Sequence, residues 1–271
     1  MNKLEQLKRL RDELGIVVNN LDNYPIDAPS IVIANHNCLM DIFYLPMALP
    51  NESVSLVSAR LMYKKEVERQ KMVYDYLYPM PIEAHGGKVY SDMCLKYASE
   101  LITNNVGVNI FPEGAYVEEN VIYKGRTGAS RILFDAREKG KYAYFIPVAI
   151  NVKNDNLDMD SYSLSNGNKV EISILEPINC EDFYYAYTHS NDKEDKNKAL
   201  HLPVDIGMME IAKVLKREYV DEYIKLRPKG NVIFEDGSVV DTKDAQSERY
   251  ITYYSDSLNT QSKKIIKLLS K

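Results

Sequence analysis

The sequence predicts an α/β fold with a largely parallel central sheet flanked by helices. Short apolar runs alternate with longer helical patterns from Ser30 to Val152, which is typical of strands and helices that follow one another around a parallel sheet. The chain has 271 residues, of which 45% are apolar and 27% are charged, and this is the balance of a packed globular protein. A chain of this length is expected to form one domain with a decorated C-terminal part.

The first half of the chain supplies most of the expected elements. Residues 1–15 repeat leucine at helical spacing among basic residues, which predicts an amphipathic helix. Its apolar side either packs on its own domain or lies on an anionic membrane surface. Strands are expected at Ser30–Ala34, Val54–Ser58, Gly107–Phe111 and Tyr144–Val152, and helices at Leu39–Ala48, Ala59–Tyr78, Lys88–Asn104 and Gly128–Lys139.

The second half has a weaker pattern. Residues 154–168 are rich in Asn, Asp and Ser, and residues 190–198 are a charged run, so we expect both to be surface loops. The remaining expected elements are a strand at Lys169–Leu175, a helix at Asp205–Arg227 and a helix-prone tail from Asp236 to Lys271.

Composition excludes several classes of protein. The net charge of −5 argues against nucleic acid as a partner, because binding to phosphates needs a basic face. Cys38, Cys94 and Cys180 have unrelated spacings, so neither a disulfide framework nor a zinc ribbon is indicated, and a reducing compartment is expected. The charged N-terminus does not resemble a secretory signal, and no apolar run is long enough for a spanning helix.

A histidine follows the first predicted core strand, where a helix is expected to begin. In the string Ser30-Ile-Val-Ile-Ala-Asn-His36-Asn-Cys-Leu-Met-Asp41, the strand ends just before His36. Catalytic groups in open α/β sheets gather at the carboxyl ends of strands. If the helix starts directly after His36, the Asp41 carboxylate can turn back, orient the imidazole and stabilise its protonated form. Taken alone, the pair is equally consistent with a helix N-terminus capped by Asn37, with Asp41 in solvent.

A second apolar strand runs into a charged turn at Phe111-Pro-Glu113-Gly114. Proline stiffens such a turn, and glycine lets the backbone come close to a ligand. Glu113 is thereby presented at the carboxyl end of a strand. A plain turn with an exposed carboxylate explains this string equally well when it is taken alone.

Together, the two strings resemble the glycerolipid acyltransferase family typified by the lysophosphatidate acyltransferases. The family's first motif, His-x-x-x-x-Asp, matches residues 36–41, and its third motif, Phe-Pro-Glu-Gly, matches residues 111–114. Residues 145–150 are similar to its fourth block, and residues 123–129 to the segment before that block. The likeness covers residues 29–151 in order and spacing.

The resemblance implies a glycerol-phosphate-acyltransferase-like fold and a mechanism. His36 would be the general base for a hydroxyl of a lipid-like acceptor, with Asp41 as its orienting partner, and the donor would be an acyl thioester, acyl-CoA or acyl carrier protein. Glu113 would bind acceptor or backbone groups, and Gly114 or neighbouring amides would stabilise the oxyanion. No metal and no organic cofactor is implied apart from the acyl donor, which is a co-substrate.

The chain departs from the family at the second motif. The family has an arginine there for the phosphate of the acceptor, whereas residues 80–88 of this chain contain none. His85 and Lys88 in that segment, and Lys124 and Arg126 further on, are the candidate phosphate- or substrate-binding residues. A lysine is a point charge and does not replace the bidentate fork of an arginine. We therefore expect acyl transfer and leave open whether the acceptor carries a phosphate.

Other functions remain open on the sequence alone. The chain can acylate a non-phosphorylated acceptor, such as a specialised metabolite or an amine, or it can be a non-catalytic lipid-binding relative. A thiol nucleophile at Cys38 is the less favoured alternative to direct attack by the hydroxyl. A metal-dependent hydrolase would use His36, Asp41, His85 and Glu113 as ligands, but their spacing is not that of a compact ligand set.

These observations divide the chain into three parts. We expect an amphipathic N-terminal helix in residues 1–28, an acyltransferase catalytic core in residues 29–151, and a C-terminal extension in residues 152–271 that completes the same domain. Lipid substrates partition into membranes, so the expected location is the cytoplasm or the cytoplasmic face of a membrane, with peripheral contact and no transmembrane helix. A role in phospholipid biosynthesis follows from the resemblance.

Overall fold

The central feature of the fold is a mostly parallel sheet. The structure is a computed structural model, and it describes residues 2–58, 67–82, 88–117, 120–153, 169–224, 232–233, 239–240 and 248–269. Within these residues the sheet has seven strands in the order β1-β8-β7-β2-β5-β3-β4. Strands β7, β2, β5, β3 and β4 run parallel, while β8 is antiparallel to β7. The bounds are β1 Val17–Asn19, β2 Ser30–Ala34, β3 Ser53–Ser58, β4 Tyr78–Ile82, β5 Gly107–Ile110, β7 Tyr144–Lys153 and β8 Lys169–Ile174.

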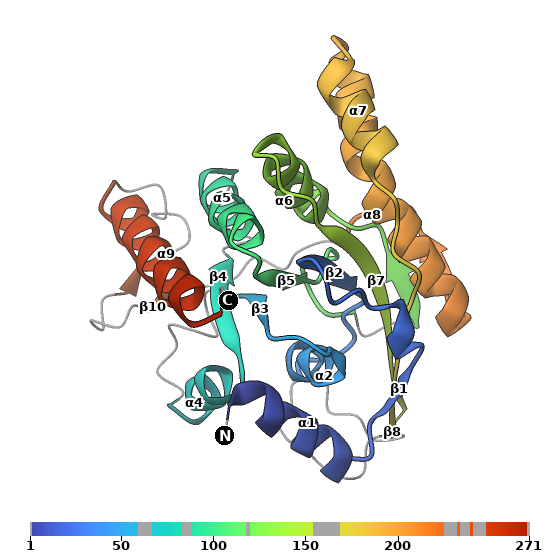
Figure 1. The fold of residues 1–271 in the computed structure, drawn as a ribbon, viewed down its shortest axis with the longest axis vertical. Helices are drawn as coiled ribbons and strands as arrows, with labels where there is room; N and C mark the ends of the chain where they lie inside the picture. The colour runs from blue at the N-terminus through green and yellow to red at the C-terminus, as the bar shows by residue number, and fades with distance from the viewer. Residues whose placement is uncertain are drawn as a thin grey trace.

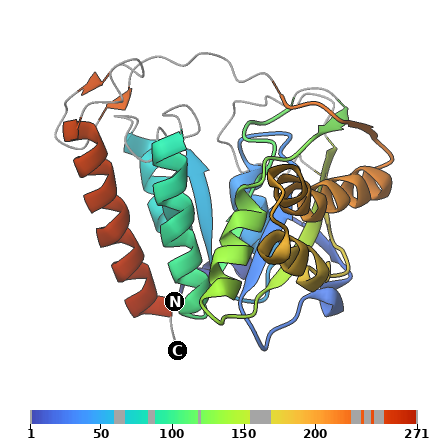
Figure 2. The same ribbon diagram turned by 90° about the horizontal axis from the view of Figure 1, so that it is seen from above.

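Helices cover both faces of this sheet (Figures 1 and 2). One face is covered by α1 (Lys3–Glu13), α2 (Asp41–Ala48) and α4 (Val67–Tyr76), and the other by α5 (Lys88–Thr103), α6 (Gly128–Glu138), α8 (Lys193–Leu215) and α9 (Glu248–Leu269). Helix α7 (Glu181–His189) packs beside α8. The short elements are η1 (Leu21–Asn23), the parallel pair β6 (Val121–Tyr123) and β9 (Glu218–Val220), and the antiparallel pair β10 (Val232–Ile233) and β11 (Val239–Val240). The predicted α/β class is confirmed.

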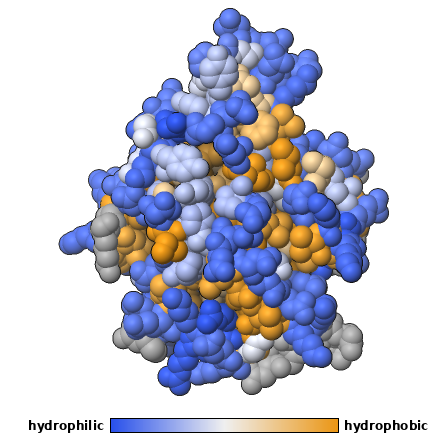
Figure 3. Space-filling view, turned by 45° about the vertical axis from the view of Figure 1, so that its right-hand side comes forward, coloured by the Kyte–Doolittle hydropathy of each residue, from blue (hydrophilic) through white to orange (hydrophobic). Residues whose placement is uncertain are grey.

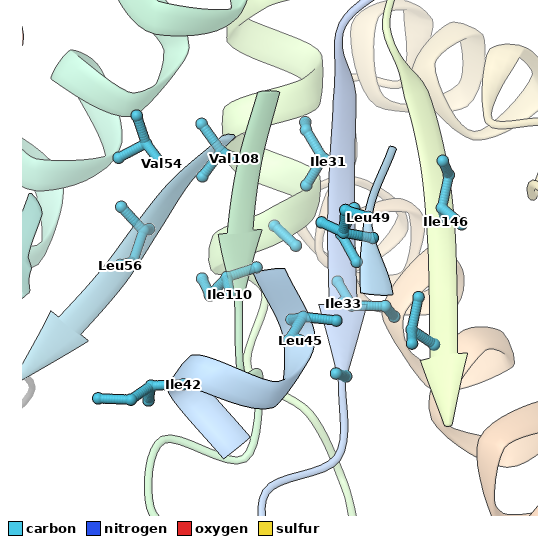
Figure 4. Close-up of a cluster of buried hydrophobic side chains, with 14 of the residues drawn as sticks. Ile31, Ile33, Ile42, Leu45, Leu49, Val54, Leu56, Val108, Ile110 and Ile146 are labelled. Carbon is cyan, nitrogen blue, oxygen red and sulfur yellow. The ribbon is translucent and has the colours of Figure 1, made fainter. Parts of the chain in front are cut away.

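The core lies between the central strands and the helices on either side. Every residue of β2 and β5 is buried, as expected for parallel strands that are covered on both faces. Figure 4 shows one cluster with members from α2, β2, β3, β5 and β7, among them Leu45 of α2, Ile33 of β2 and Ile110 of β5. This packed centre fixes where β2 and β5 end, and both strands end beside the candidate site.

The N-terminal helix packs on its own domain. Leu7 is buried, and α1 contacts α2 and α4. The Lys3 ammonium donates hydrogen bonds to the carbonyls of Tyr74 and Leu77 at the end of α4. Of the two roles predicted for this helix, the structure favours packing over an interfacial position, and residues 17–19 continue the segment into the sheet as β1.

Several predicted boundaries are wrong, for identifiable reasons. The predicted helix 59–78 includes residues outside those described, and its last residue, Tyr78, belongs to β4. This strand was not predicted because it contains two prolines, which usually interrupt a strand. They are tolerated here because β4 lies at the edge of the sheet. Residues 193–198 belong to α8, where Asp192 is the N-cap, and not to a loop. The predicted helix 205–227 ends at Leu215, because the chain turns there and enters β9.

The C-terminal part of the chain packs directly on the predicted core. Strand β8 pairs with β7, and α9 covers the edge strand β4, where the Tyr254 hydroxyl donates to the Pro81 carbonyl at 2.8 Å. Helix α8 presses on the sheet so closely that a Cβ at Gly207 would lie 2.5 Å from Cδ1 of Ile33. The outer surface beside α7 and α8 interleaves apolar and polar side chains (Figure 3). No helix in the described part of the chain is long and apolar enough to cross a bilayer.

Candidate active site

His36 and Asp41 form a pair at the carboxyl end of β2. Nδ1 of His36 lies 3.1 Å from Oδ2 of Asp41, and the side chains are 12% and 0% exposed. A carboxylate can only accept, so the proton of a neutral imidazole lies on Nδ1, and Nε2 keeps its lone pair. This is the tautomer that takes a proton from a hydroxyl group.

The loop that leads into α2 orients Asp41 toward the histidine. Oδ2 of Asp41 also accepts hydrogen bonds from the backbone N–H groups of Asn37, at 2.6 Å, and Cys38, at 2.8 Å. Asp41 is the first residue of α2, and its carboxylate closes the preceding loop by accepting these two N–H groups from residues ahead of the helix. The carboxylate is therefore fixed by the backbone before it contacts the imidazole.

Glu113 lies beside His36 because β2 and β5 are neighbours in register. Ile33 pairs with Ile110, so His36 and Glu113 each follow three positions after a paired residue. Oε2 of Glu113 accepts the backbone N–H of His36 at 2.8 Å, and Oε1 accepts that of Tyr123 at 3.0 Å. Glu113 was predicted to bind either acceptor groups or backbone groups. Its hydrogen bonds within the described residues are with backbone N–H groups.

Burial dominates the electrostatics of Glu113, which is 1% exposed. The pKa of Glu113 is raised to about 8, chiefly because burial disfavours the charged form. The N–H groups of Tyr123 and His36 and the charge of Arg217 oppose this rise, and the Asp41 carboxylate adds to it. This buried carboxyl is thus a positioning group. A change in its protonation alters the hydrogen bond that it accepts from the backbone N–H of His36.

Aromatic rings restrain the imidazole. The rings of His36 and Phe111 stack with centroids 4.3 Å apart and planes inclined by 25°, and Tyr116 meets His36 edge-on at 5.9 Å. Phe111 belongs to the same Phe-Pro-Glu-Gly turn as Glu113. The turn therefore positions both the backbone and the ring of His36.

Gly114 shapes the backbone of the Phe-Pro-Glu-Gly turn. It adopts a left-handed conformation with φ of 81°, and its N–H donates to the Phe111 carbonyl at 3.1 Å. That hydrogen bond closes the turn, and Gly114 is needed for the backbone conformation of the turn. The oxyanion contact expected from Gly114 or neighbouring amides stays a prediction.

The predicted basic residues divide into three groups. His85 lies outside the described residues, and Lys88 is described only as the first residue of α5. The Lys124 ammonium forms ion pairs with Asp221 at 2.6 Å and with Asp205 at 3.7 Å. Arg126 is exposed, and its guanidinium lies over the ring of Tyr223.

Sequence reasoning missed Arg217 and Asn35, and it considered Asn37 only as a helix cap. Asn35 is fully buried and joins β2 to β7 through the backbone of Ile150, and its Nδ2 donates to Oδ1 of Asn37 at 2.6 Å. The same Oδ1 accepts from a guanidinium nitrogen of Arg217 at 2.7 Å. The two asparagines flank a candidate histidine, which is a usable signal. Arg217 lies 180 positions further along the chain, and no local pattern marks it.

Cys38 has the environment of a core residue. It is 1% exposed, and burial together with the Asp41 carboxylate raises the pKa of its thiol. A thiol held in its protonated form is a poor nucleophile, so the contacts favour direct attack by the acceptor. In the described part of the chain, no three His, Cys, Asp or Glu side chains are grouped so as to bind a metal ion.

We expect the close packing of Gly125 to make it intolerant of any side chain. A Cβ there would lie 2.4 Å from Cγ1 of Val204 and 2.8 Å from Cβ of Pro112, neither of which is the end of a flexible chain. Gly125→Ala should lower the free energy of unfolding by about 1–3 kcal/mol. It should also reduce kcat, because a shift of Pro112 displaces the adjacent Glu113, which binds the backbone of His36.

Urea denaturation and initial rates test this expectation against Gly140→Ala. Gly140 has φ of 80°, and a Cβ at this position would meet no atom within 4 Å, so its replacement strains only the backbone at the end of α6. The control should lose stability with an unchanged kcat. Equal kcat values in the two variants would contradict a coupling between Gly125 and the site.

The fold and the site together define a class: an α/β protein with a histidine–aspartate pair at the carboxyl edge of its parallel sheet, suited to accepting a proton from a hydroxyl. Comparison with known proteins then specifies the family. The profile of the family described as Acyltransferase matches residues 15–151, and the chain belongs to this acyltransferase family.

One solved structure shows how far the likeness in fold extends. The chain is similar to the 1-acyl-sn-glycerophosphate (LPA) acyltransferase PlsC from Thermotoga maritima, with a TM-score of 0.50 and 19% identity over 77% of this chain and 79% of that one. A search of curated proteins found no match. The predicted resemblance is thus confirmed for the family and for the fold.

Proposed function

We propose that this protein is an O-acyltransferase that moves a fatty-acyl group from a thioester, either acyl-CoA or acyl carrier protein, to a hydroxyl of a lysolipid such as 1-acylglycerol-3-phosphate. The observation that carries this proposal is the 3.1 Å contact between His36 and Asp41, at a strand end where the family motif is present. The acceptor named for PlsC is the reason for the choice of lysolipid.

The reaction needs one base and no covalent intermediate with the protein. Nε2 of His36 takes the proton of the acceptor hydroxyl as the oxygen attacks the thioester carbonyl, and the new C–O bond forms. When the C–S bond breaks, the thiolate takes the proton from the imidazolium. Asp41 stabilises the imidazolium in between, and its own backbone contacts prevent it from moving away.

No metal or organic cofactor enters this proposal, because the thioester is already activated and the leaving thiolate is stable. A lysolipid is presented from a membrane, so we propose peripheral contact with a membrane on the cytoplasmic side. We propose that the C-terminal part helps to hold the site in place. Tyr123 of β6 donates its backbone N–H to Glu113, and β6 pairs with β9 from the C-terminal part.

Release of free thiol tests the proposal. Purified protein is incubated with acyl-CoA or acyl carrier protein and with a panel of lysolipids, glycerol 3-phosphate, monoacylglycerol and amines, and products are identified by mass spectrometry. We expect acceptor-dependent thiol release and an ester product. Retention of lipid without turnover across the panel would instead identify a binding protein, and an amide product would identify an amine acceptor.

A further inference from the structure

Arg217 comes from the C-terminal part of the chain but lies against the loop that carries the catalytic pair. A guanidinium nitrogen donates to Oδ1 of Asn37, the residue directly after His36, at 2.7 Å. The Arg217 side chain is half-buried, and the charge of Asp41 acts on it, joined by that of Glu113 when this carboxyl is ionised. It is thus the cation that the fold brings to the first motif from outside that motif.

The end of α8 explains this placement. Lys216 has a left-handed backbone with φ of 55°, and the N–H of Arg217 returns to the Ala212 carbonyl at 2.9 Å. These features form a helix-ending motif that reverses the chain. Because lysine lacks the freedom of glycine at such a position, the surrounding packing must maintain it. Strand β9 then begins at Glu218 and pairs with β6, which fixes Arg217 on both sides.

Arg217 keeps hydrogen-bond donors that no described residue uses. Lys124 is neutralised by Asp221 and Asp205, and Arg126 is exposed over an aromatic ring. Among the residues that the structure describes, no ion pair involves Arg217, and its one hydrogen bond uses a single nitrogen of the fork. Burial lowers the pKa of Arg217 despite the attraction of Asp41 and Glu113. A half-buried guanidinium with unused donors is suited to an anionic ligand.

We propose that Arg217 binds a phosphate of the acceptor and so sets acceptor specificity, in place of the arginine missing from residues 80–88. This rests on the proposed function, because the acceptor must approach His36 for its hydroxyl to be deprotonated. Asn37 directly follows His36 and accepts a hydrogen bond from Arg217, so a phosphate bound to Arg217 lies beside the loop that carries His36. The phosphates of acyl-CoA are the other source of the same chemistry, and the experiment separates the two.

Steady-state kinetics with a matched pair of acceptors tests the proposal. The pair is 1-oleoylglycerol-3-phosphate and 1-oleoylglycerol, which differ only in the phosphate. Arg217→Met should raise KM for the phosphorylated acceptor about 10- to 100-fold, the value of a charge-assisted hydrogen bond, with little change in kcat. KM for 1-oleoylglycerol and for acyl-CoA should stay unchanged, and Arg217→Lys should fall between. Arg131→Met is the control, because Arg131 pairs with Asp92 on the surface.

Other patterns would overturn the proposal. Equal losses with both acceptors would mean that Arg217 only positions the Asn37 loop, and a rise confined to the KM of acyl-CoA would assign the arginine to the donor. If Arg126→Met produced the specificity change and Arg217→Met did not, the exposed arginine would be the phosphate ligand.

A binding measurement keeps this proposal separate from the proposed function. Calorimetric titration with glycerol 3-phosphate needs no turnover, so it applies even if no acceptor is acylated. We expect binding to the unmodified chain and to Arg131→Met, and loss of binding in Arg217→Met that is folded by circular dichroism. Binding retained in Arg217→Met, or no binding to the unmodified chain together with no preference for the phosphorylated acceptor, would overturn the proposal.

Discussion

Replacing His36 by alanine is expected to lower the rate of acyl transfer about a thousandfold or more, the effect of removing a positioned general base. Within the described residues, the ring makes no hydrogen bond other than that with Asp41, and the hydrogen bond from its backbone to Glu113 survives the change. The variant should therefore fold and bind substrates while thiol release from acyl-CoA falls to background. Stopped and continuous thiol assays with acceptor present measure the loss.

His189→Ala is the matched control for this prediction. His189 is exposed on α7 and stacks on Tyr185, so its removal should leave the rate unchanged. Equal thiol release by His36→Ala and the unmodified protein would refute the role of His36 as base.

Asp41→Asn tests the orientation of the imidazole. Oδ2 of Asp41 accepts from Nδ1–H of His36 and from the backbone N–H groups of Asn37 and Cys38 alike. An asparagine that places its amide oxygen there loses only the negative charge that stabilises the imidazolium, and one that places its N–H₂ group there also forces the ring proton onto Nε2. In both cases we expect a loss of roughly 10²- to 10⁴-fold in kcat. An unchanged kcat in a folded variant would show that the pair is structural.

Replacing Glu113 by glutamine is expected to remove a large pH dependence of stability. The pKa of Glu113 is raised from 4.5 to about 8 by burial, so between these values the unfolded chain is ionised while the folded chain keeps its proton. Folding then takes up a proton, and the free energy of unfolding of the unmodified protein should fall as pH rises through this window, by roughly 5 kcal/mol in total. The stabilisation is complete below about pH 4.5 and is lost above the folded pKa.

The glutamine variant lacks this titration. Its N–H₂ group would face one of the backbone N–H groups of His36 or Tyr123, so it should be less stable at low pH by about 1–3 kcal/mol. Because the unmodified protein loses more stability than this as pH rises, the difference between the two proteins should shrink and then change sign, with Glu113→Gln the more stable at high pH. Urea denaturation at several pH values measures it, with Glu138→Gln, at an exposed position, as control. Parallel pH curves for the unmodified protein and Glu113→Gln would contradict the raised pKa.

The fold class was predictable because the parallel strands are buried on both faces. Strands such as β2 read as continuous apolar runs that end abruptly in polar residues, and this also marked His36 and Glu113. Strand β4 was missed because its two prolines resemble a break, and only its place at the sheet edge makes them acceptable. The start of α8 was missed because its charged first turn resembles a solvated loop.

The candidate site was predictable in its chemistry and only partly in its roles. Gly114 shows the limit: a glycine in a turn predicts conformational freedom, but whether its N–H is spare depends on the carbonyl of Phe111. Lys124 likewise stood out as a basic residue, and its partners Asp205 and Asp221 come from elements that no local pattern connects to it.

The sequence by itself determined the family, the pairing of His36 with Asp41 and the presence of Glu113 beside a strand end, because these depend on short spacings and on apolar runs that local geometry decides. Only the tertiary structure decided that Glu113 binds the backbone of His36, and that Arg217 meets Asn37 from the far end of the chain. Contacts of that kind depend on strand register and helix endings. They form when separate elements pack together, so no local sequence pattern predicts them.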